Sequence, residues 1–337
     1  MLTIDASQGE GGGQIVRTAL ALSLATGTPF VLDKIRAGKK TPGLLRQHVV
    51  AVQAAVAVSA GESEGAQPGS LRLTFRPRRR GGGTHKFDAT ASGSAVLVAQ
   101  TLVPALLGAS EPAEIVVHGG THIPASPCYE FFEGSYLGLL RKMGADVRCE
   151  LWRHGFAPDG GGALRVWVSP RPLRRLDVAT RGRVLARRAV AKVARLSSGI
   201  AEREIAVLTN RLGWGKVGLT VEEVEAVGSG NIVVATLKFA EVTLVMAELG
   251  NREVAAEYTA RNLADRMDRF LPTDVPVDEH LADQLILPMA LAGGGSFRTV
   301  EPSAHTRTQI GVLAAFLPEL PVAVEPDGRG AWLVKIG

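Results

Sequence analysis

The spacing of hydrophobic residues alternates between helical and strand periods in an order that recurs along the chain. Residues 14–26 place Ile15, Ala19 and Leu22 on one helical face, and the pattern that follows predicts a strand, a loop, a second helix and a further strand. The same order begins again near residue 94 and near residue 279, and each of these later units ends in two strands. The pattern therefore predicts three repeated helix–strand–loop–helix–strand–strand units.

Matching turn residues support the repeat. Gly38 and Gly120 occupy corresponding loop positions in the first two units, and a proline precedes the second helix of every unit, namely Pro42, Pro124 and Pro302. A unit of this kind forms a sheet with two helices and must bury one face against its neighbours. We expect an α/β fold of α+β layers in which the three units form one large domain.

A segment from about residue 173 to residue 276 interrupts this pattern. Two long helical patterns bracket two strand patterns there, in the order 189–211, 216–227, 231–240 and 253–271. This order predicts a smaller α/β domain inserted between the second and third units. The expected boundaries are residues 1–180 and 275–337 for the large domain and 181–274 for the insertion.

The composition is typical of a protein with a large core, since 46% of the 337 residues are hydrophobic. No apolar run reaches the roughly 18 residues that a membrane-spanning helix needs. The N-terminal "MLTIDASQGE" lacks the regions of a secretory signal. Cys128 and Cys149 form no CxxC pair or disulfide framework, which suits a reducing compartment. These features predict a cytoplasmic protein without a membrane partner.

The positive charge is concentrated near the N-terminus. Residues 1–83 carry six more basic than acidic side chains, whereas the whole chain has a net charge of +5. This distribution suggests a polyanionic partner, although the run "RPRRR" at 76–80 is equally well explained as a solvated charged face. An aromatic content of 5% argues against a platform that stacks many bases.

The stretch "QGEGGGQIVR", residues 8–17, is a glycine-rich loop that leads into a helix. It lacks the Lys-Ser/Thr pair of a P-loop, and Gln14 stands where a dinucleotide fingerprint has its third glycine. Its backbone N–H groups can still face an anion. A carboxylate beside phosphate needs a cation between them, so Glu10 is either a Mg²⁺ or Mn²⁺ ligand or a solvated loop acid. Clustered basic residues nearby favour phosphate binding: Arg17, Arg36, Lys39, Lys40 and Arg46.

Candidate chemistry also appears in the third unit. His305 stands where a helix begins, and the partial positive charge there favours the uncharged ring, whose free nitrogen can attack phosphorus. Asp283 and Gln284, with the more ambiguous His280, lie in the early turns of the preceding helix and can face the same opening. Each of these residues has a plainer role as a capping or helix-start residue. Gln100, a lone polar residue in an apolar helix, is either a satisfied core amide or part of the site.

Four strings together resemble the RNA 3′-terminal-phosphate cyclase family: "QGEGGGQIVR", "IRAGKKTPGLLRQH", "HLADQLILPMALAGGG" and "PSAHTRTQI". The similarity extends over essentially the whole chain and includes "GGTHIPASP" and "RHGFAPDGGG". It implies three repeated units with an inserted domain. It also implies ATP-dependent conversion of an RNA 3′-phosphate into a 2′,3′-cyclic phosphate, with release of AMP and pyrophosphate.

The resemblance also implies site residues. His305 matches the histidine that becomes adenylylated, and Glu10 matches the metal-binding glutamate. The positions matching ATP or phosphate contacts are Gln100, His280, Leu281, Ala282, Asp283, Gln284, Arg17, Arg36 and Lys39. Two positions depart from the pattern, because His280 stands where tyrosine is frequent and Lys39 where arginine is common. The implied partner is RNA with a 3′-phosphate end, and we infer no protein partner.

Two rival functions remain. One is a non-catalytic, cyclase-like protein that binds RNA or assists ribosome assembly, and such a protein would be expected to lack His305. The other is a carboxyvinyl transferase, which rests on fold analogy alone. The presence of His305 with Glu10 and Asp283 favours the enzyme.

Overall fold

The computed structural model describes residues 1–337 except 80, 91–92 and 215–217. Arg80 of the basic run therefore lies outside the described residues, as do the first two residues of the strand predicted at 216–227. In the described part, the strands form four sheets of four strands each, and three of these sheets share one topology.

Each unit contains six elements in the order strand, helix, strand, helix, strand, strand. The first unit comprises β1 (Leu2–Asp5), α1 (Gln14–Thr26), β2 (Phe30–Asp33), α2 (Arg46–Ser59), β3 (Glu62–Glu64) and β4 (Leu73–Arg76). The second comprises β5 (Gly83–Asp88), α3 (Ala95–Leu106), β6 (Ala113–Gly119), the π-helical η1 (Phe131–Tyr136) continuing into α4 (Leu137–Lys142), β7 (Asp146–Arg153) and β8 (Gly162–Ser169). The third comprises β9 (Leu176–Val178), α7 (Glu279–Leu291), β14 (Gly295–Thr299), α8 (Ala304–Phe316), β15 (Val322–Pro326) and β16 (Trp332–Ile336).

The strand order confirms the threefold repeat. In every unit the first strand pairs in parallel with the second, and the last strand pairs antiparallel with both the second strand and the strand that precedes it. The strand orders are β1-β2-β4-β3, β5-β6-β8-β7 and β9-β14-β16-β15. The opening strand of each unit was not predicted. Because β9 pairs with β14, the insertion interrupts the third unit after its first strand and does not separate the second unit from the third.

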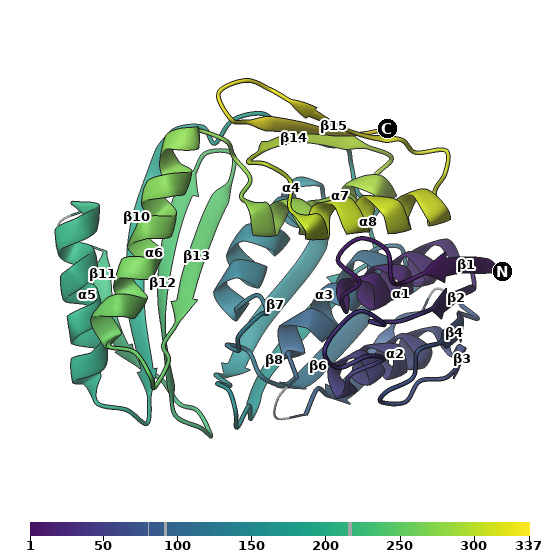
Figure 1. Ribbon diagram of the computed structural model, residues 1–337, viewed down its shortest axis with the longest axis horizontal. Coiled ribbons are helices and arrows are strands. Elements are labelled where there is room, and N and C mark those ends of the chain that lie inside the picture. Colours follow the sequence, from purple (N-terminus) through teal and green to yellow (C-terminus); the bar gives the residue numbers. More distant parts are fainter. Residues whose placement is uncertain (80, 91–92, 215–217) are drawn as a thin grey trace.

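The helices of the three units face one another at the centre of the large body, with the sheets outside them (Figure 1). Helix α1 contacts α2, α3, α7 and α8 and is buried along most of its length. Leu20 and Leu22 of α1 are fully buried, and burying a side chain of this size contributes about 1.5–3 kcal/mol. This central packing brings the N-terminal turn of α8 close to the glycine loop that precedes α1.

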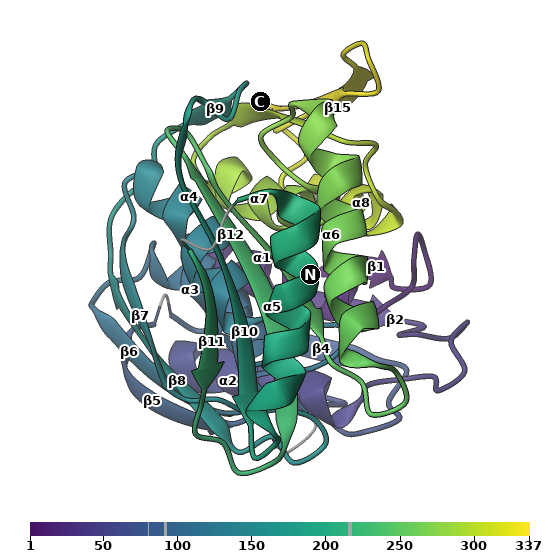
Figure 2. The same cartoon turned by 90° about the vertical axis from the view of Figure 1, so that its left-hand side faces the viewer.

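The inserted segment forms its own layer. Its elements are β10 (Val184–Ala194), α5 (Ser198–Leu212), β11 (Leu219–Glu223), β12 (Gly230–Phe239), β13 (Thr243–Leu249), α6 (Ala256–Phe270) and the short 3₁₀ helix η2 (Leu271–Thr273). The strands form the sheet β11-β10-β12-β13, and α5 and α6 lie side by side against one of its faces (Figure 2). That residues 181–274 form a separate inserted domain stays a prediction.

The helix predicted at 189–211 was wrong over residues 189–197. Residues 189–194 belong to strand β10, and helix α5 begins at Ser198, where the Ser197 side chain caps it. The alanines, arginines and lysine of β10 are compatible with a helix, but this strand pairs with both β11 and β12. Pairing on both edges outweighs the weak intrinsic preference of these residues. Strand β13 was not predicted.

Two further expectations concern the bulk properties. No helix in the described residues is long and apolar enough to cross a membrane. Both cysteines are free and buried, Cys128 beside η1 and Cys149 in β7. They therefore behave as small apolar side chains.

Candidate active site

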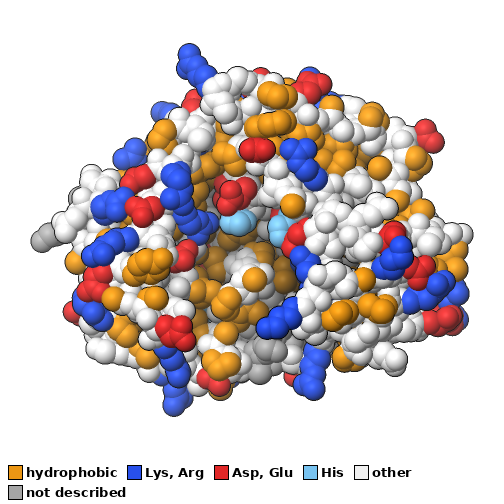
Figure 3. Space-filling model, in the orientation of Figure 1, with side chains coloured by type: hydrophobic (Ala, Val, Ile, Leu, Met, Phe, Trp, Pro, Cys, Tyr) orange, Lys and Arg blue, Asp and Glu red, His pale blue; other side chains and the backbone are white. Residues whose placement is uncertain are grey.

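A cavity of about 1100 Å³ opens between the central helices and the insertion. Figure 3 shows its mouth as a hollow with histidine side chains in it. One wall comes from α1, α3, α7, α8 and the loop 123–128, and the other comes from the insertion between β13 and α6. This volume exceeds the roughly 1,000 Å³ at the upper end of ordinary small-molecule sites, so it has room for a nucleotide and part of a second substrate.

His305 lies in the first turn of α8, which the Ser303 side chain caps by accepting a hydrogen bond from the Thr306 N–H (3.2 Å). Nδ1 of the ring is 2.6 Å from Gln14 Oε1 and 2.7 Å from Glu10 Oε2. An amide oxygen can only accept, so Nδ1 donates to Gln14 and Nε2 is the nitrogen left to present a lone pair. No hydrogen bond of Nε2 is found among the described residues, and the side chain, 49% exposed, lines the cavity.

The glycine loop reaches His305 because it folds against α8. The Glu10 N–H donates to Thr308 Oγ1 (2.9 Å), one turn beyond His305. Gly9 has a φ of +63°, and a Cβ there would overlap the Thr308 hydroxyl. Glycine is therefore needed at this position for both conformational and steric reasons.

Glu10 has spare capacity for a cation. Its Oε1 pairs with Lys39 Nζ at 3.2 Å, whereas Oε2 is buried and, despite its closeness to His305, makes no hydrogen bond of good geometry. Mg²⁺ and Mn²⁺ prefer oxygen ligands, and Mg²⁺ is commonly held by one or two carboxylates together with substrate phosphates and water. The residues present thus fit a divalent ion at Glu10 that a bound phosphate would complete.

Arg17 and Asp283 face the same cavity from α1 and α7. Burial lowers the pKa of Arg17 to about 10, although Asp283 and Glu10 counteract this, so the guanidinium stays charged. Burial and the nearby Asp278 raise the pKa of Asp283 to about 8 against the opposing effect of Arg17. An Asp283 carboxyl that keeps its proton at neutral pH can donate as well as accept a hydrogen bond.

The start of α7 divides the predicted residues between cavity and core. The Asp278 side chain caps the helix by accepting from the Leu281 N–H (2.8 Å). His280 and Gln284 line the cavity, and Gln284 Oε1 is buried without a hydrogen-bond partner, an acceptor that a ligand can satisfy. Leu281 and Ala282 are fully buried in the core, so their side chains do not face the cavity.

Of the remaining predicted residues, one lines the cavity and two do not. Gln100 of α3 is half-buried and lines the cavity. Arg36 and Lys39 are not among the described residues that line it. Lys39 reaches the site through Glu10, and Arg36 Nη2 donates to the Thr41 carbonyl (3.1 Å) while its Nε is buried without a partner.

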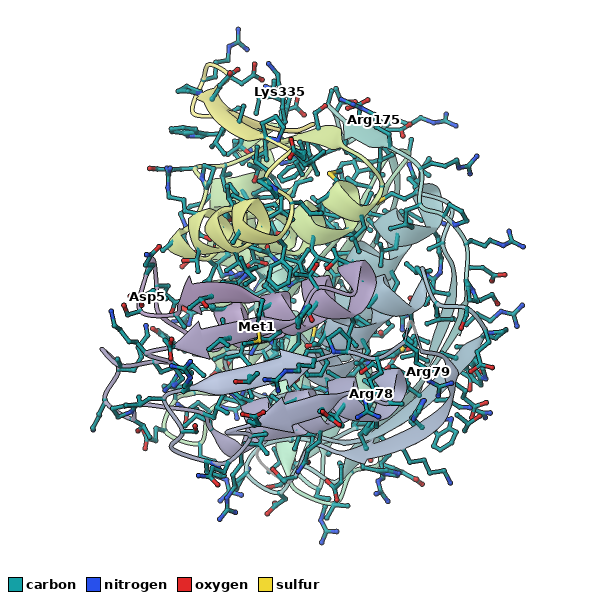
Figure 4. The ribbon with its side chains drawn as sticks, turned by 90° about the vertical axis from the view of Figure 1, so that its right-hand side faces the viewer. Met1, Asp5, Arg78, Arg79, Arg175 and Lys335 are labelled. Atoms are coloured by element: carbon teal, nitrogen blue, oxygen red, sulfur yellow. The ribbon has the colours of Figure 1, made fainter. Side chains whose placement is uncertain are left out.

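The basic run in the first unit faces elsewhere. Arg76, Arg78 and Arg79 pair with Glu64, Glu62 and Glu111. Figure 4, viewed from the side opposite the insertion, shows Arg78 and Arg79 near each other at the surface. Exposed pairs of this kind contribute only about 0–1 kcal/mol each. For these three side chains the structure favours the solvated charged face.

Sequence reasoning missed part of the cavity wall. Gln14 was noted only as a departure from a glycine motif, yet it contacts His305 across 291 positions of the chain. The insertion supplies a second group of lining residues, Glu248–Val254 with Tyr258, Asn262 and Arg266. No local pattern marks these positions, because they meet the units only through tertiary packing.

Comparisons with known proteins agree on one family. A family model described as RNA 3′-terminal phosphate cyclase matches residues 8–320. Proteins named "RNA 3'-terminal phosphate cyclase" from Ectopseudomonas mendocina (strain ymp), Koribacter versatilis (strain Ellin345) and Ralstonia nicotianae (strain ATCC BAA-1114 / GMI1000) are 46%, 42% and 44% identical. The alignments cover 95%, 94% and 99% of this chain and 94%, 90% and 96% of the relatives. A solved structure of the enolpyruvyl transferase NikO from Streptomyces tendae aligns over 98% of this chain and 47% of that chain at 10% identity, but its TM-score of 0.37 is too low to carry an argument.

Proposed function

The chain belongs to the RNA 3′-terminal phosphate cyclase family and is an enzyme, and from this premise we propose that it cyclises RNA 3′-phosphate ends through an adenylylated His305. The overall reaction consumes ATP and releases AMP and pyrophosphate. The observation that carries the proposal is the His305 ring, whose Nδ1 is hydrogen-bonded to Gln14 and lies 2.7 Å from Glu10 Oε2, while Nε2 is free beside the cavity.

In the first step, His305 Nε2 attacks the α-phosphorus of ATP. A bond forms between Nε2 and phosphorus, the bond to the bridging oxygen breaks, and pyrophosphate leaves with that electron pair. The ring becomes positively charged because Nδ1 keeps its proton. The Glu10 carboxylate, 2.7 Å from Nδ1, stabilises this charge as it develops.

Recognition of the nucleotide is divided between two groups of side chains. Arg17 carries positive charge for phosphate oxygens, and Lys39 balances Glu10. Gln284 Oε1 offers an unsatisfied acceptor, and the protonated Asp283 offers a donor, for the polar edge of the base or ribose. A divalent ion held by Glu10 would supply charge neutralisation at the phosphates.

The second and third steps transfer AMP and close the ring. An oxygen of the RNA 3′-phosphate attacks the phosphorus on His305, and Nε2 departs with its electron pair as a neutral imidazole. The neighbouring 2′-hydroxyl then attacks the activated 3′-phosphorus, loses its proton to solvent and expels AMP. Nucleophile and phosphorus share one ribose, so proximity contributes much of this last step.

The test is retention of label by the protein. Wild type, His305→Ala and His118→Ala are incubated with ATP labelled at the α- or γ-phosphate and precipitated in alkali, which preserves a phosphoramidate. His118 is an exposed histidine of β6 outside the cavity, so its variant is the matched control. We expect wild type and His118→Ala to retain α-label only, and His305→Ala to retain none.

Two results would contradict the proposal. One is retention of γ-label, which would mean that a phosphate other than the α-phosphate is transferred. The other is equal α-label in His305→Ala, which would place the nucleophile elsewhere. Addition of RNA with a 3′-phosphate should then remove the label from wild type and yield a cyclic end resistant to phosphatase.

A further inference from the structure

A second group of chemically capable side chains lies beside the cavity, where the second unit meets the insertion. His122 follows β6, Glu130 directly precedes η1, and His154 follows β7. One potential ligand atom from each lies within 4.8 Å of the others. The proposed reaction uses none of these residues, although the adjacent Ile123 and Phe131 line the cavity.

His122 is held in the orientation typical of a metal ligand. Its side chain is fully buried, with Nε2 at 2.8 Å from Glu130 Oε2 and Nδ1 at 2.8 Å from Thr121 Oγ1. The Thr121 hydroxyl also accepts from the Gly155 N–H (2.8 Å), which fixes its position. Metal-bound histidines usually donate their second ring N–H to a fixed oxygen, and Thr121 Oγ1 provides one.

One ring nitrogen of His154 makes no hydrogen bond to the described residues. Its Nε2 is buried and has no hydrogen-bond partner. Leaving a buried polar group unsatisfied costs about 1–3 kcal/mol, so such an atom calls for a ligand. Burial, with His122 and Lys192, lowers the pKa of His154 to about 4, which leaves a neutral ring with a lone pair.

The carboxylate completes the donor set. Although burial opposes it, His122 and Lys192 lower the pKa of Glu130, so this side chain is ionised. Two imidazoles and one carboxylate are donors that Zn²⁺ and the neighbouring transition-metal ions accept, with a fourth position left for water.

We propose that His122, Glu130 and His154 form a binding site for Zn²⁺ or a similar transition-metal ion, formed by residues other than Glu10. On binding, the Nε2 proton of His122 leaves to solvent and Nδ1 takes up a proton from solvent, so the ring stays neutral and donates from Nδ1 to Thr121. The ion ties the loop before η1 to the strand end at His154, which bridges to Ala226 of the insertion. Its role is to fix the cavity wall against the insertion.

Two features of the cluster oppose binding and shape the test. Lys192 Nζ lies 2.7 Å from Glu130 Oε1, so the ion must use Oε2 and is repelled by the ammonium. The His122 and His154 rings are stacked, with centroids 5.0 Å apart and planes at 22°, so one ring must turn before both can bind one ion. His154 is the one to turn, because its Nε2 has no hydrogen bond to lose.

The experiment measures metal binding and not activity. Full-length protein is stripped with a chelator and titrated with Zn²⁺ by calorimetry and with Co²⁺ by visible absorption, all in a Glu10→Gln background that removes the other expected site. We expect one ion per chain, with Co²⁺ bands of nitrogen and oxygen ligation. Replacing Lys192 with methionine should tighten binding at least about tenfold, since relieving 1.4 kcal/mol of repulsion suffices.

Matched variants decide whether these residues are the ligands. His154→Gln and His122→Asn should each weaken binding at least about tenfold, whereas His118→Ala should bind as the parent does. His154→Gln changes a half-buried side chain and keeps the test valid if His122→Asn fails to fold. Equal binding by parent and His154→Gln, or no saturable binding by either the parent or Lys192→Met, would overturn the proposal. Label retention at His305 is independent of these outcomes, so the two proposals fail separately.

Discussion

Substitution of Asp283 by asparagine tests the most perturbed carboxyl of the cavity. The raised pKa of Asp283, about 8, means that the folded chain holds a proton there at neutral pH. Asparagine has nearly the same shape and keeps one donor and one acceptor, but it cannot ionise. The variant therefore removes the titration while leaving the packing of α7 in place.

The magnitude follows from proton linkage. Between about pH 4 and about pH 8 the folded chain keeps a proton on Asp283 that the unfolded chain has lost, so the free energy of unfolding falls as pH rises. One pKa unit corresponds to about 1.4 kcal/mol, so Asp283 should cost wild type up to about 2.7 kcal/mol between pH 5 and pH 7. This is an upper limit, because the carboxyl faces a cavity that water can enter.

Urea unfolding followed by circular dichroism measures the effect. We expect Asp283→Asn to become more stable than wild type as pH rises from about 5 to about 8, and the difference to stay constant above that. Glu301→Gln, at an exposed carboxylate, is the control and should show no such trend. If the difference between Asp283→Asn and wild type did not change with pH, Asp283 would be ionised in the folded chain, and its proposed role as a donor would fall.

Three further changes are predicted. Mg²⁺ should enhance ATP binding at least about tenfold less in Glu10→Gln than in wild type, because the variant lacks the carboxylate oxygen that fits the metal. Calorimetry with and without Mg²⁺ measures this, and an unchanged enhancement would place the metal elsewhere. Gly9→Ala should lower stability by at least about 1 kcal/mol and reduce labelling of His305, since a left-handed backbone and an overlap with the Thr308 hydroxyl both oppose the new methyl group. Partial recovery in Gly9→Ala with Thr308→Ala, which lacks that hydroxyl, would separate overlap from strain, and a stable, fully labelled Gly9→Ala would contradict the geometry. Burial and the charges of Arg17 and Arg36 lower the pKa of His48 to about 3, so wild type loses up to about 1.4 kcal/mol of stability per pH unit as pH falls from about 6.5 towards 3. His48→Gln lacks this loss and should unfold at lower pH than wild type, and an acid unfolding midpoint that does not move would refute this.

The sequence was most informative where structure depends on near neighbours. The beginning of α8 could be predicted because Pro302 precedes it and an apolar helical pattern follows, and this placed His305 where the helix begins. Family membership was likewise predictable, since long ordered motifs such as "QGEGGGQIVR" are retained in the chain.

Elements defined by distant pairing were harder to predict. Strands β1, β5 and β9, with four, six and three residues, acquire their identity by pairing with the next strand of their unit. The pairing of β9 with β14 spans the whole insertion, so no local window reveals that the third unit begins before it. The second half of β10, residues 189–194, was mistaken for a helix for the same reason.

The sequence alone therefore determined the repeat, the approximate helix starts within the three units and the residue types available for chemistry, because spacing and capping act within a few residues. Tertiary structure alone decided that Gln14 and Glu10 contact His305, that Leu281 and Ala282 turn into the core, and that the insertion closes the cavity. These contacts join positions far apart in the chain, and only the packing of the central helices brings them within bonding distance.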